Sequence, residues 1–169
     1  DGRFSSTDPS FPAGGYIVFG RTDGIPGLDL ASMTASDGVL ISGGPELGSD
    51  SLDMIAGAGD FNGDGLADVV FEASFRPSST NSGVVFVVFG QTDPAERILL
   101  NELDGADGFR VAGSGMWQKL GRWADSAGDV NVDGIDDLVL SSGRGISQPF
   151  EDAIVIFGTT SAMPPVLSD

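Results

Sequence analysis

The sequence predicts an all-β fold made of β-propeller blades, with about two full four-stranded antiparallel blades and partial blades at both ends. A set of motifs recurs with a period of about 70 residues. The apolar runs within each period are short, rich in β-branched residues and bounded by Gly, Asp, Ser or Pro, and none has the length and periodicity of a full helix. A β-sandwich with two similar halves is the alternative.

The repeat is visible in three separate kinds of marker that share one period. Across residues 58–71 and 127–140, eight of 14 aligned positions are identical. Chance similarity between short motifs is therefore a poor explanation. The markers are Phe-Gly pairs at 19–20, 89–90 and 157–158, Asp-Gly pairs at 37–38 and 107–108, and acidic loops that begin at Asp60 and Asp129.

The β-branched runs predict nine strands, about four in each period. Pro26–Met33 and Ala95–Leu103 place leucines at mixed spacing, and we expect one short helical turn in each. The predicted strands are Tyr16–Phe19, Val39–Ser42, Asp53–Gly57, Ala67–Ala73, Val84–Phe89, Phe109–Ala112, Arg122–Ser126, Asp137–Ser141 and Ala153–Phe157.

We expect residues 1–169 to form one propeller segment of three repeats, namely a partial blade at about 1–46, a blade at 47–113, and a blade lacking its last strand at 114–169. Propellers close with about four to eight blades. The sequence is therefore expected to be a fragment of a closed propeller or a subunit completed by oligomerisation, because unpaired blade edges invite association.

The composition of the chain disfavours several classes of function. The 25 acidic and eight basic residues give a formal net charge of -17, which disfavours nucleic acid and anionic membranes and favours divalent cations. There is no run of about 20 apolar residues, so membrane insertion is not expected. Cys and His are absent and Lys119 is the only lysine, so no catalytic constellation is visible and we expect no enzymatic activity.

Both acidic loops read D-x-N-x-D-G-x-x-D, at Asp60–Asp68 and Asp129–Asp137. Oxygen-bearing side chains at positions 1, 3, 5 and 9 can converge if the loop wraps tightly, and Gly at position 6 permits the turn. An EF-hand would need Glu at position 12 and flanking helices, whereas position 12 is Phe71 or Leu140 and strands flank the loops. An acidic turn without an ion is the alternative.

This pattern resembles the FG-GAP repeats of the integrin α-subunit propeller and of bacterial surface proteins. The likeness runs from Leu47-Gly48 through Gly59-Asp60, and again from Leu120-Gly121 through Gly128-Asp129, with Leu in place of Phe. It implies two Ca²⁺ sites, with side-chain ligands at positions 1, 3, 5 and 9 and a backbone carbonyl at position 7. The implied ligands are Asp60, Asn62, Asp64, Leu66 and Asp68 in the first loop, and Asp129, Asn131, Asp133, Ile135 and Asp137 in the second.

Other residues have simpler expected roles. Asp136, at position 8, should point away from the ion as a solvated acid. Trp117 and Trp123 with Met116 are expected to pack between blades rather than form a sugar-binding platform. Arg76 and Arg144 occupy equivalent places after a strand and are expected to be surface charges in loops.

The resemblance implies a calcium-stabilised, integrin-like propeller module of a secreted or cell-surface protein, or of a periplasmic one, that serves adhesion or protein–protein assembly. A second hypothesis is a structural subunit of an extracellular filament or envelope complex in which copies complete each other's blades. A third is a non-catalytic accessory domain of a secreted calcium-dependent enzyme. A protein partner or self-association is expected. A carbohydrate ligand is unsupported, because no sugar-specific constellation is visible.

Overall fold

Strands and connecting turns make up almost all of the computed structural model, which describes residues 14–22, 24, 27–30, 33–43, 52–73, 82–95, 97–113, 119–143 and 151–168. Within these ranges there is no α-helix, and no helix that is long and apolar enough to span a membrane. The chain forms two units, one from residues before position 50 together with 92–102 and one from the remainder.

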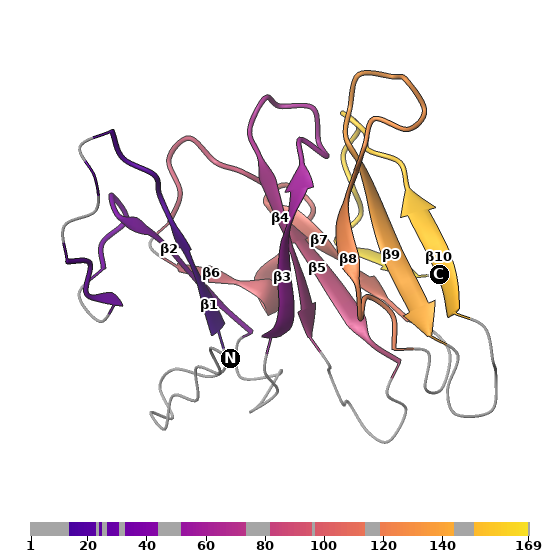
Figure 1. The fold of residues 1–169 in the computed structure, drawn as a ribbon, viewed down its shortest axis with the longest axis horizontal. Helices are drawn as coiled ribbons and strands as arrows, with labels where there is room; N and C mark the ends of the chain where they lie inside the picture. Colours follow the sequence, from indigo (N-terminus) through magenta and orange to yellow (C-terminus); the bar gives the residue numbers. More distant parts are fainter. Residues whose placement is uncertain are drawn as a thin grey trace. The chain divides into compact units, whose positions relative to one another are not determined.

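The first unit contains a three-stranded sheet (Figure 1). β1 (Gly14–Val18) pairs antiparallel with β2 (Gly38–Ser42), and β6 (Arg97–Leu99) lies parallel to β2 on its other side. Val39 and Ile41 of β2 are buried, as expected for the middle strand of a sheet.

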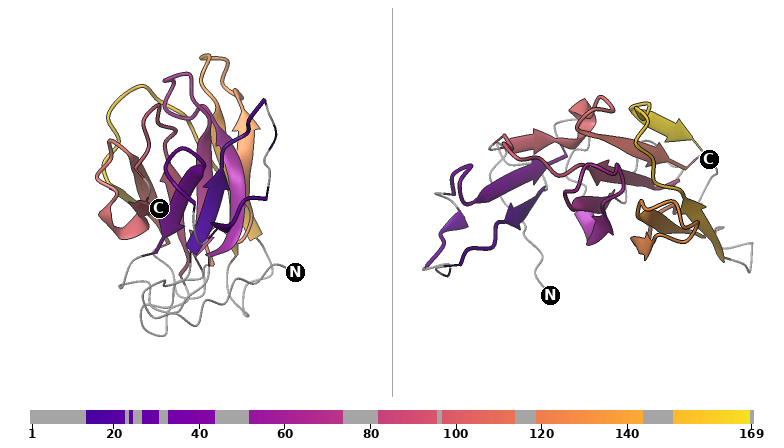
Figure 2. Two further views of the ribbon diagram at one scale, coloured as in Figure 1. Left: turned by 90° about the vertical axis from the view of Figure 1, so that its left-hand side faces the viewer. Right: turned by 90° about the horizontal axis from the view of Figure 1, so that it is seen from above.

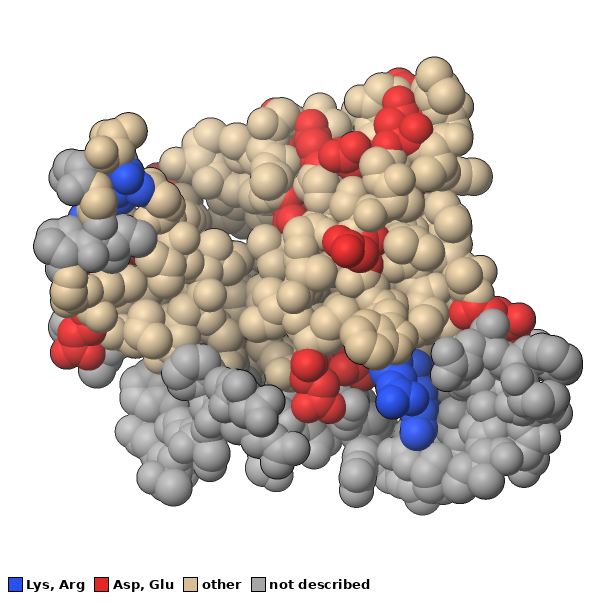
Figure 3. Space-filling model, in the orientation of Figure 1, with Lys and Arg blue, Asp and Glu red and all other residues tan. Residues whose placement is uncertain are grey.

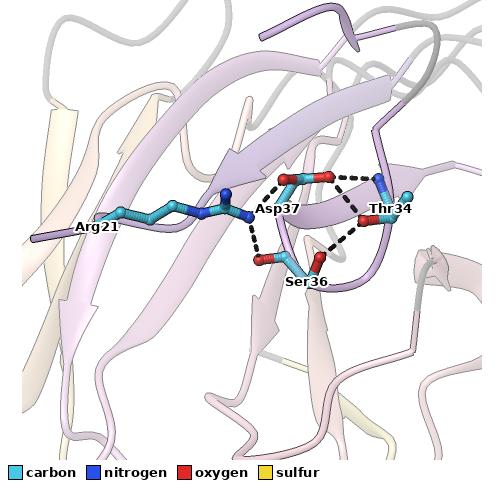
Figure 4. Close-up of polar contacts among 4 residues, drawn as sticks. All are labelled: Arg21, Thr34, Ser36 and Asp37. Atoms are coloured by element: carbon cyan, nitrogen blue, oxygen red, sulfur yellow. Dashed lines mark hydrogen bonds and ion pairs between the residues drawn. The ribbon is translucent and has the colours of Figure 1, made fainter. Parts of the chain in front are cut away.

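The turn that leads into β2 is held by polar contacts (Figure 4). Asp37 accepts hydrogen bonds from the Thr34 hydroxyl at 2.7 Å and the Thr34 N–H at 3.0 Å, and it forms an ion pair with Arg21. The Thr34 hydroxyl is the main reason why the pKa of Asp37 lies below its ordinary value, and the Arg21 guanidinium adds to the effect. Asp107 accepts an N–H bond in the equivalent turn of the next repeat, from Asp104.

The second unit is built around a five-stranded sheet. Its first four strands are antiparallel neighbours, as in the predicted blade, and its fifth strand is parallel to the fourth. In spatial order the strands are β3 (Leu52–Gly59), β4 (Asp68–Ala73), β5 (Val84–Val88), β7 (Gly108–Ala112) and β11 (Val166–Ser168).

A second sheet of this unit contains β8 (Ala124–Gly128), β9 (Asp137–Gly143) and β10 (Glu151–Ile156), all antiparallel. β3 and β8 are in contact, and seen from above the two sheets lie side by side (Figure 2). One apolar core fills the space between them. Its buried members are Ala58, Phe61, Val70, Val85, Val87, Phe89, Phe109, Val111, Leu120, Ala124, Leu138 and Leu140.

All nine predicted strands are present, which confirms the all-β, blade-like fold. β6 and β11 were not predicted. They are equivalent segments of successive repeats, 69 positions apart, and each lies parallel to the last strand of the preceding repeat, β2 or β7. They cover strand edges that would otherwise be open.

The helical turns predicted in the same segments are found only in part. Ala95–Leu103 contains β6 followed by one turn of 3-10 helix, η3 (Leu100–Glu102). Its counterpart, Pro26–Met33, lies partly outside the described residues.

Candidate cation loops

The two acidic loops are hairpin connections between neighbouring strands, as the repeat predicts. Asp60–Asp68 joins β3 to β4 and Asp129–Asp137 joins β8 to β9, and both loops lie at the same edge of the second unit (Figure 1). Acidic side chains are visible along this edge (Figure 3). The position 6 glycines, Gly65 and Gly134, have φ of +87° and +91°, so they provide the left-handed turn that the motif requires.

The carboxylate at position 1 accepts hydrogen bonds from the backbone of its own loop, which curls around it. The two carboxylate oxygens of Asp60 accept N–H bonds from Asp64 at 3.0 Å and Gly65 at 2.9 Å. The Oδ1 atom of Asn62 accepts from the same Asp64 N–H at 3.0 Å. The oxygens of positions 1 and 3 therefore converge on the N–H of position 5. In the second loop Asp129, Asn131, Asp133 and Gly134 repeat these bonds at 2.8–3.1 Å.

The acids at position 5 face the inside of the turn. Asp64 accepts from the Leu66 N–H at 2.8 Å and from the Asn62 side-chain amide at 2.9 Å. Asp133 accepts in the same way from Ile135 and Asn131, at 2.9 and 2.8 Å. Both acids are exposed, so they can exchange these donors for a cation at little desolvation cost.

The acids at position 9 are buried and anchor each loop to a distant turn. Asp68 accepts from the N–H groups of Phe61 and Gly90, both at 2.8 Å. Asp137 accepts from Val130 and Gly158, both at 2.9 Å.

Burial raises the pKa of Asp68 to about 6, and the N–H groups of Gly90 and Phe61 oppose this rise. The structural role of the position 9 acids was not predicted. Its only sequence signal is the Phe-Gly pair about 20 residues later, which provides the second N–H.

The donor set suits a hard cation. Carboxylate, amide and carbonyl oxygens are the ligands that calcium prefers, and the loop backbone is already wrapped. In the part of the chain that the structure describes, no group of three or more Asp, Glu, His or Cys side chains is gathered as a ready-made metal cluster. The acids instead accept backbone N–H bonds. The ligand roles of these side chains, and of the Leu66 and Ile135 carbonyls, stay predictions.

The prediction that Asp136 is a solvated acid is wrong. This residue is half-buried and its carboxylate accepts a hydrogen bond from the Asp60 N–H of the other loop at 2.9 Å. Position 8 follows the tight turn, so its side chain points toward the neighbouring sheet. The motif of either loop does not indicate this contact, because it joins residues 76 positions apart.

Within this chain, the prediction that Trp123 packs between blades is also wrong. Its side chain is 67% exposed, because it precedes β8 on the face opposite the shared core. Trp117, Met116, Arg76, Arg144 and the Leu47-Gly48 pair lie outside the described residues.

Comparisons with known proteins match this chain to proteins that carry the same repeat. Residues 54–88, which span β3, the first loop, β4 and β5, match the FG-GAP repeat. Phosphatidylinositol-glycan-specific phospholipase D of Rattus norvegicus is 31% identical over 129 residues, and integrin alpha-4 of Xenopus laevis is 28% identical over 128 residues. The bovine (Bos taurus) phospholipase D is 29% identical over 129 residues.

Each of these matches covers 75% of this chain but only 11–14% of the relative. The similarity thus concerns a repeat region and not the whole of those proteins. The matched repeat contains the first acidic loop, and the second loop has the same hydrogen bonds at the same positions. Residues 54–88 therefore form an FG-GAP repeat.

Proposed function

We propose that the chain is a calcium-stabilised FG-GAP module of a secreted or cell-surface protein, and that it serves adhesion or protein–protein assembly. The observation that carries the calcium proposal is the shared geometry of the two loops, in which the oxygens of positions 1 and 3 converge in both copies. Two loops that differ in sequence at four of nine positions keep the same fold around the same oxygen donors.

Calcium in these loops would act as a structural staple. It would neutralise carboxylates that repel one another in its absence. Each loop joins two strands of one sheet, so binding has no pair of helices to open, as it would in a sensor. The residues that would hold the ions are Asp60, Asn62, Asp64, Leu66 and Asp68, and Asp129, Asn131, Asp133, Ile135 and Asp137.

Calcium removal tests this proposal. Each site adds about 2.7 kcal/mol of stability when free calcium is 100 times its dissociation constant. The thermal midpoint should therefore fall by several degrees when calcium is replaced by excess EGTA, measured by far-UV circular dichroism. The Asp64→Ala/Asp133→Ala double variant should lose this response. An unchanged wild-type midpoint in EGTA would contradict the proposal.

An exposed apolar face supports the assembly role. On the side of the β8–β9–β10 sheet that faces away from the shared core, Trp123, Val155 and Phe157 are 67%, 44% and 56% exposed. Their equivalents one repeat earlier are Met54, Val87 and Phe89, and these belong to or pack against the core that the second sheet covers. The same positions are thus buried in one repeat and exposed in the next.

We propose that a second copy of this chain binds this face. A sheet of the same repeat type already covers the equivalent face of the preceding repeat, so a sheet of another copy offers the matching chemistry. Head-to-tail contacts of this kind would place a sheet of one copy against a sheet of the next, as β8–β9–β10 lies against the preceding sheet within this chain. The alternative hypothesis of a structural subunit rests on the same face.

Self-association tests the assembly proposal. Sedimentation velocity from about 1 to 200 μM should show oligomers in the wild type. Val155→Ser should weaken association about tenfold, because a buried Val side chain is worth about 1.5 kcal/mol or more. Val166→Ser is the matched control, since Val166 is 41% exposed but lies in β11. A strictly monomeric wild type would overturn the proposal.

A non-catalytic accessory domain is the second candidate function. It is favoured by the similarity to phosphatidylinositol-glycan-specific phospholipase D, of which this chain matches 14%. A catalytic domain found in the same polypeptide would support this role over self-assembly.

A further inference from the structure

The two cation loops contact each other directly. The Asp136 carboxylate accepts from the Asp60 N–H at 2.9 Å, and the Asp136 N–H donates to the Asp60 carbonyl at 3.2 Å. Next to this pair, the Thr159 N–H donates to the Phe61 carbonyl at 3.0 Å. Three hydrogen bonds therefore join position 8 of the second loop and its neighbouring turn to positions 1 and 2 of the first.

Glycine at position 59 makes room for this contact. A Cβ atom at Gly59 would lie 2.2 Å from the Asp136 carboxylate, whereas a Cβ at its equivalent, Gly128, would have no neighbour within 4 Å. Both glycines have similar φ values, +73° and +66°. Gly128 is therefore an internal control for Gly59. The two glycines have similar backbone conformations, but only Gly59 lies against a side chain of the other loop.

The contact depends on a residue that only the second loop has. Position 8 is Asp136 in the second loop and Ala67 in the first. Asp136 lies between Ile135 and Asp137, two implied ligands of the second ion, and it holds Asp60, the first implied ligand of the other ion. Fixing residues 135–137 around one ion therefore also fixes the backbone at position 1 of the other loop.

We propose that Asp136 couples the two calcium sites, so that binding of one ion strengthens binding of the other. This inference rests on the proposed calcium function. Coupling between sites is reciprocal and typically changes affinity by about 5- to 150-fold. The two loops are joined by one hydrogen bond to a charged group and two between backbone groups. We therefore expect one bound ion to increase the affinity for the other about fivefold to tenfold. Asp136 is a positioning residue and is not itself expected to touch the ion.

Isothermal titration with Ca²⁺ tests the coupling. Asp133→Ala leaves only the first loop intact and Asp64→Ala leaves only the second, so these variants give the two single-site affinities. The overall two-ion association constant of the wild type should exceed the product of these affinities about fivefold or more. In an Asp136→Ala background, which reproduces Ala67 of the first loop, the ratio should fall to about one.

Two controls separate coupling from charge and from folding. Asp136→Asn keeps an acceptor for the Asp60 N–H and should keep much of the ratio, and Asp104→Ala removes an exposed acid that bonds to Ala106 in another turn and should leave it unchanged. Gly59→Ala should also lower the ratio to about one, whereas Gly128→Ala should leave it unchanged. This pair tests the coupling independently of any change at Asp136.

The possible outcomes distinguish the coupling from the calcium function itself. Two bound ions with a wild-type ratio of one would overturn the coupling alone. A ratio that survives both Asp136→Ala and Gly59→Ala would do the same. Absence of any calcium binding would overturn the proposed function and the coupling with it.

Discussion

Asp137→Ala is expected to destabilise the second unit by about 3–5 kcal/mol even in excess EGTA, where no calcium is bound. The Asp137 side chain is fully buried, and its two oxygens accept N–H bonds from Val130 and Gly158. Truncation removes the acceptor of both N–H groups at a buried position. Each unsatisfied buried donor costs about 1–3 kcal/mol. Urea denaturation followed by far-UV circular dichroism measures the loss.

Asp133→Ala is the control for this prediction. Asp133 is an implied ligand of the same loop, but it is exposed, and its carboxylate accepts from the Ile135 N–H and the Asn131 amide within the turn. In EGTA its removal should cost about 1 kcal/mol or less. Equal losses for the two variants would show that position 9 has no structural role beyond that of the other acids. Asp68→Ala should repeat the large effect in the first loop, because Asp68 makes the same two bonds.

The parts of this fold that could be predicted from sequence are those encoded in local patterns. The loops combine a fixed spacing of Asp and Asn with Gly at a left-handed turn, and their internal hydrogen bonds span at most seven residues. The main strands have a strong β-branched signal, of which Val84–Val88 is the clearest example. The repeat then places both features in a blade.

Contacts between repeats could not be predicted, because they depend on how one sheet sits on the next. β6 and β11 have only three residues each and form because a neighbouring strand offers a free edge. In sequence Asp136 has the features of a surface acid, and only the three-dimensional structure shows its hydrogen bond to the first loop. Similarly, packing of Trp123 between blades was predicted because the sequence does not show that its side chain lies on the outer face of the sheet.

The Leu120-Gly121 pair is such a contact between sheets, and it leads to the second large expected effect. Gly121 has φ of +82°, and a Cβ atom there would lie 2.0 Å from a methyl group of Val85. Leu120 is fully buried in the shared core, and its N–H donates to the Ser82 carbonyl at 2.9 Å. The glycine therefore lets the second sheet approach the first closely enough for Leu120 to reach the core.

Gly121→Ala should destabilise the second unit by about 2–4 kcal/mol. Left-handed backbone costs a residue with a Cβ about 1–2 kcal/mol, and overpacking against a rigid core adds about 1–3 kcal/mol. Val85 cannot move aside easily, since it is β-branched and fully buried. Gly128→Ala shares the left-handed φ but has no neighbour within 4 Å, so it should show the backbone cost alone.

A double-mutant cycle separates the clash from the backbone strain. Val85→Ala removes the methyl group that the new Cβ would strike, so Gly121→Ala should cost about 1 kcal/mol less in that background than in the wild type. The same substitution should leave the cost of Gly128→Ala unchanged. If Gly121→Ala and Gly128→Ala cost the same in urea denaturation, close approach of the two sheets at this corner is not what requires glycine.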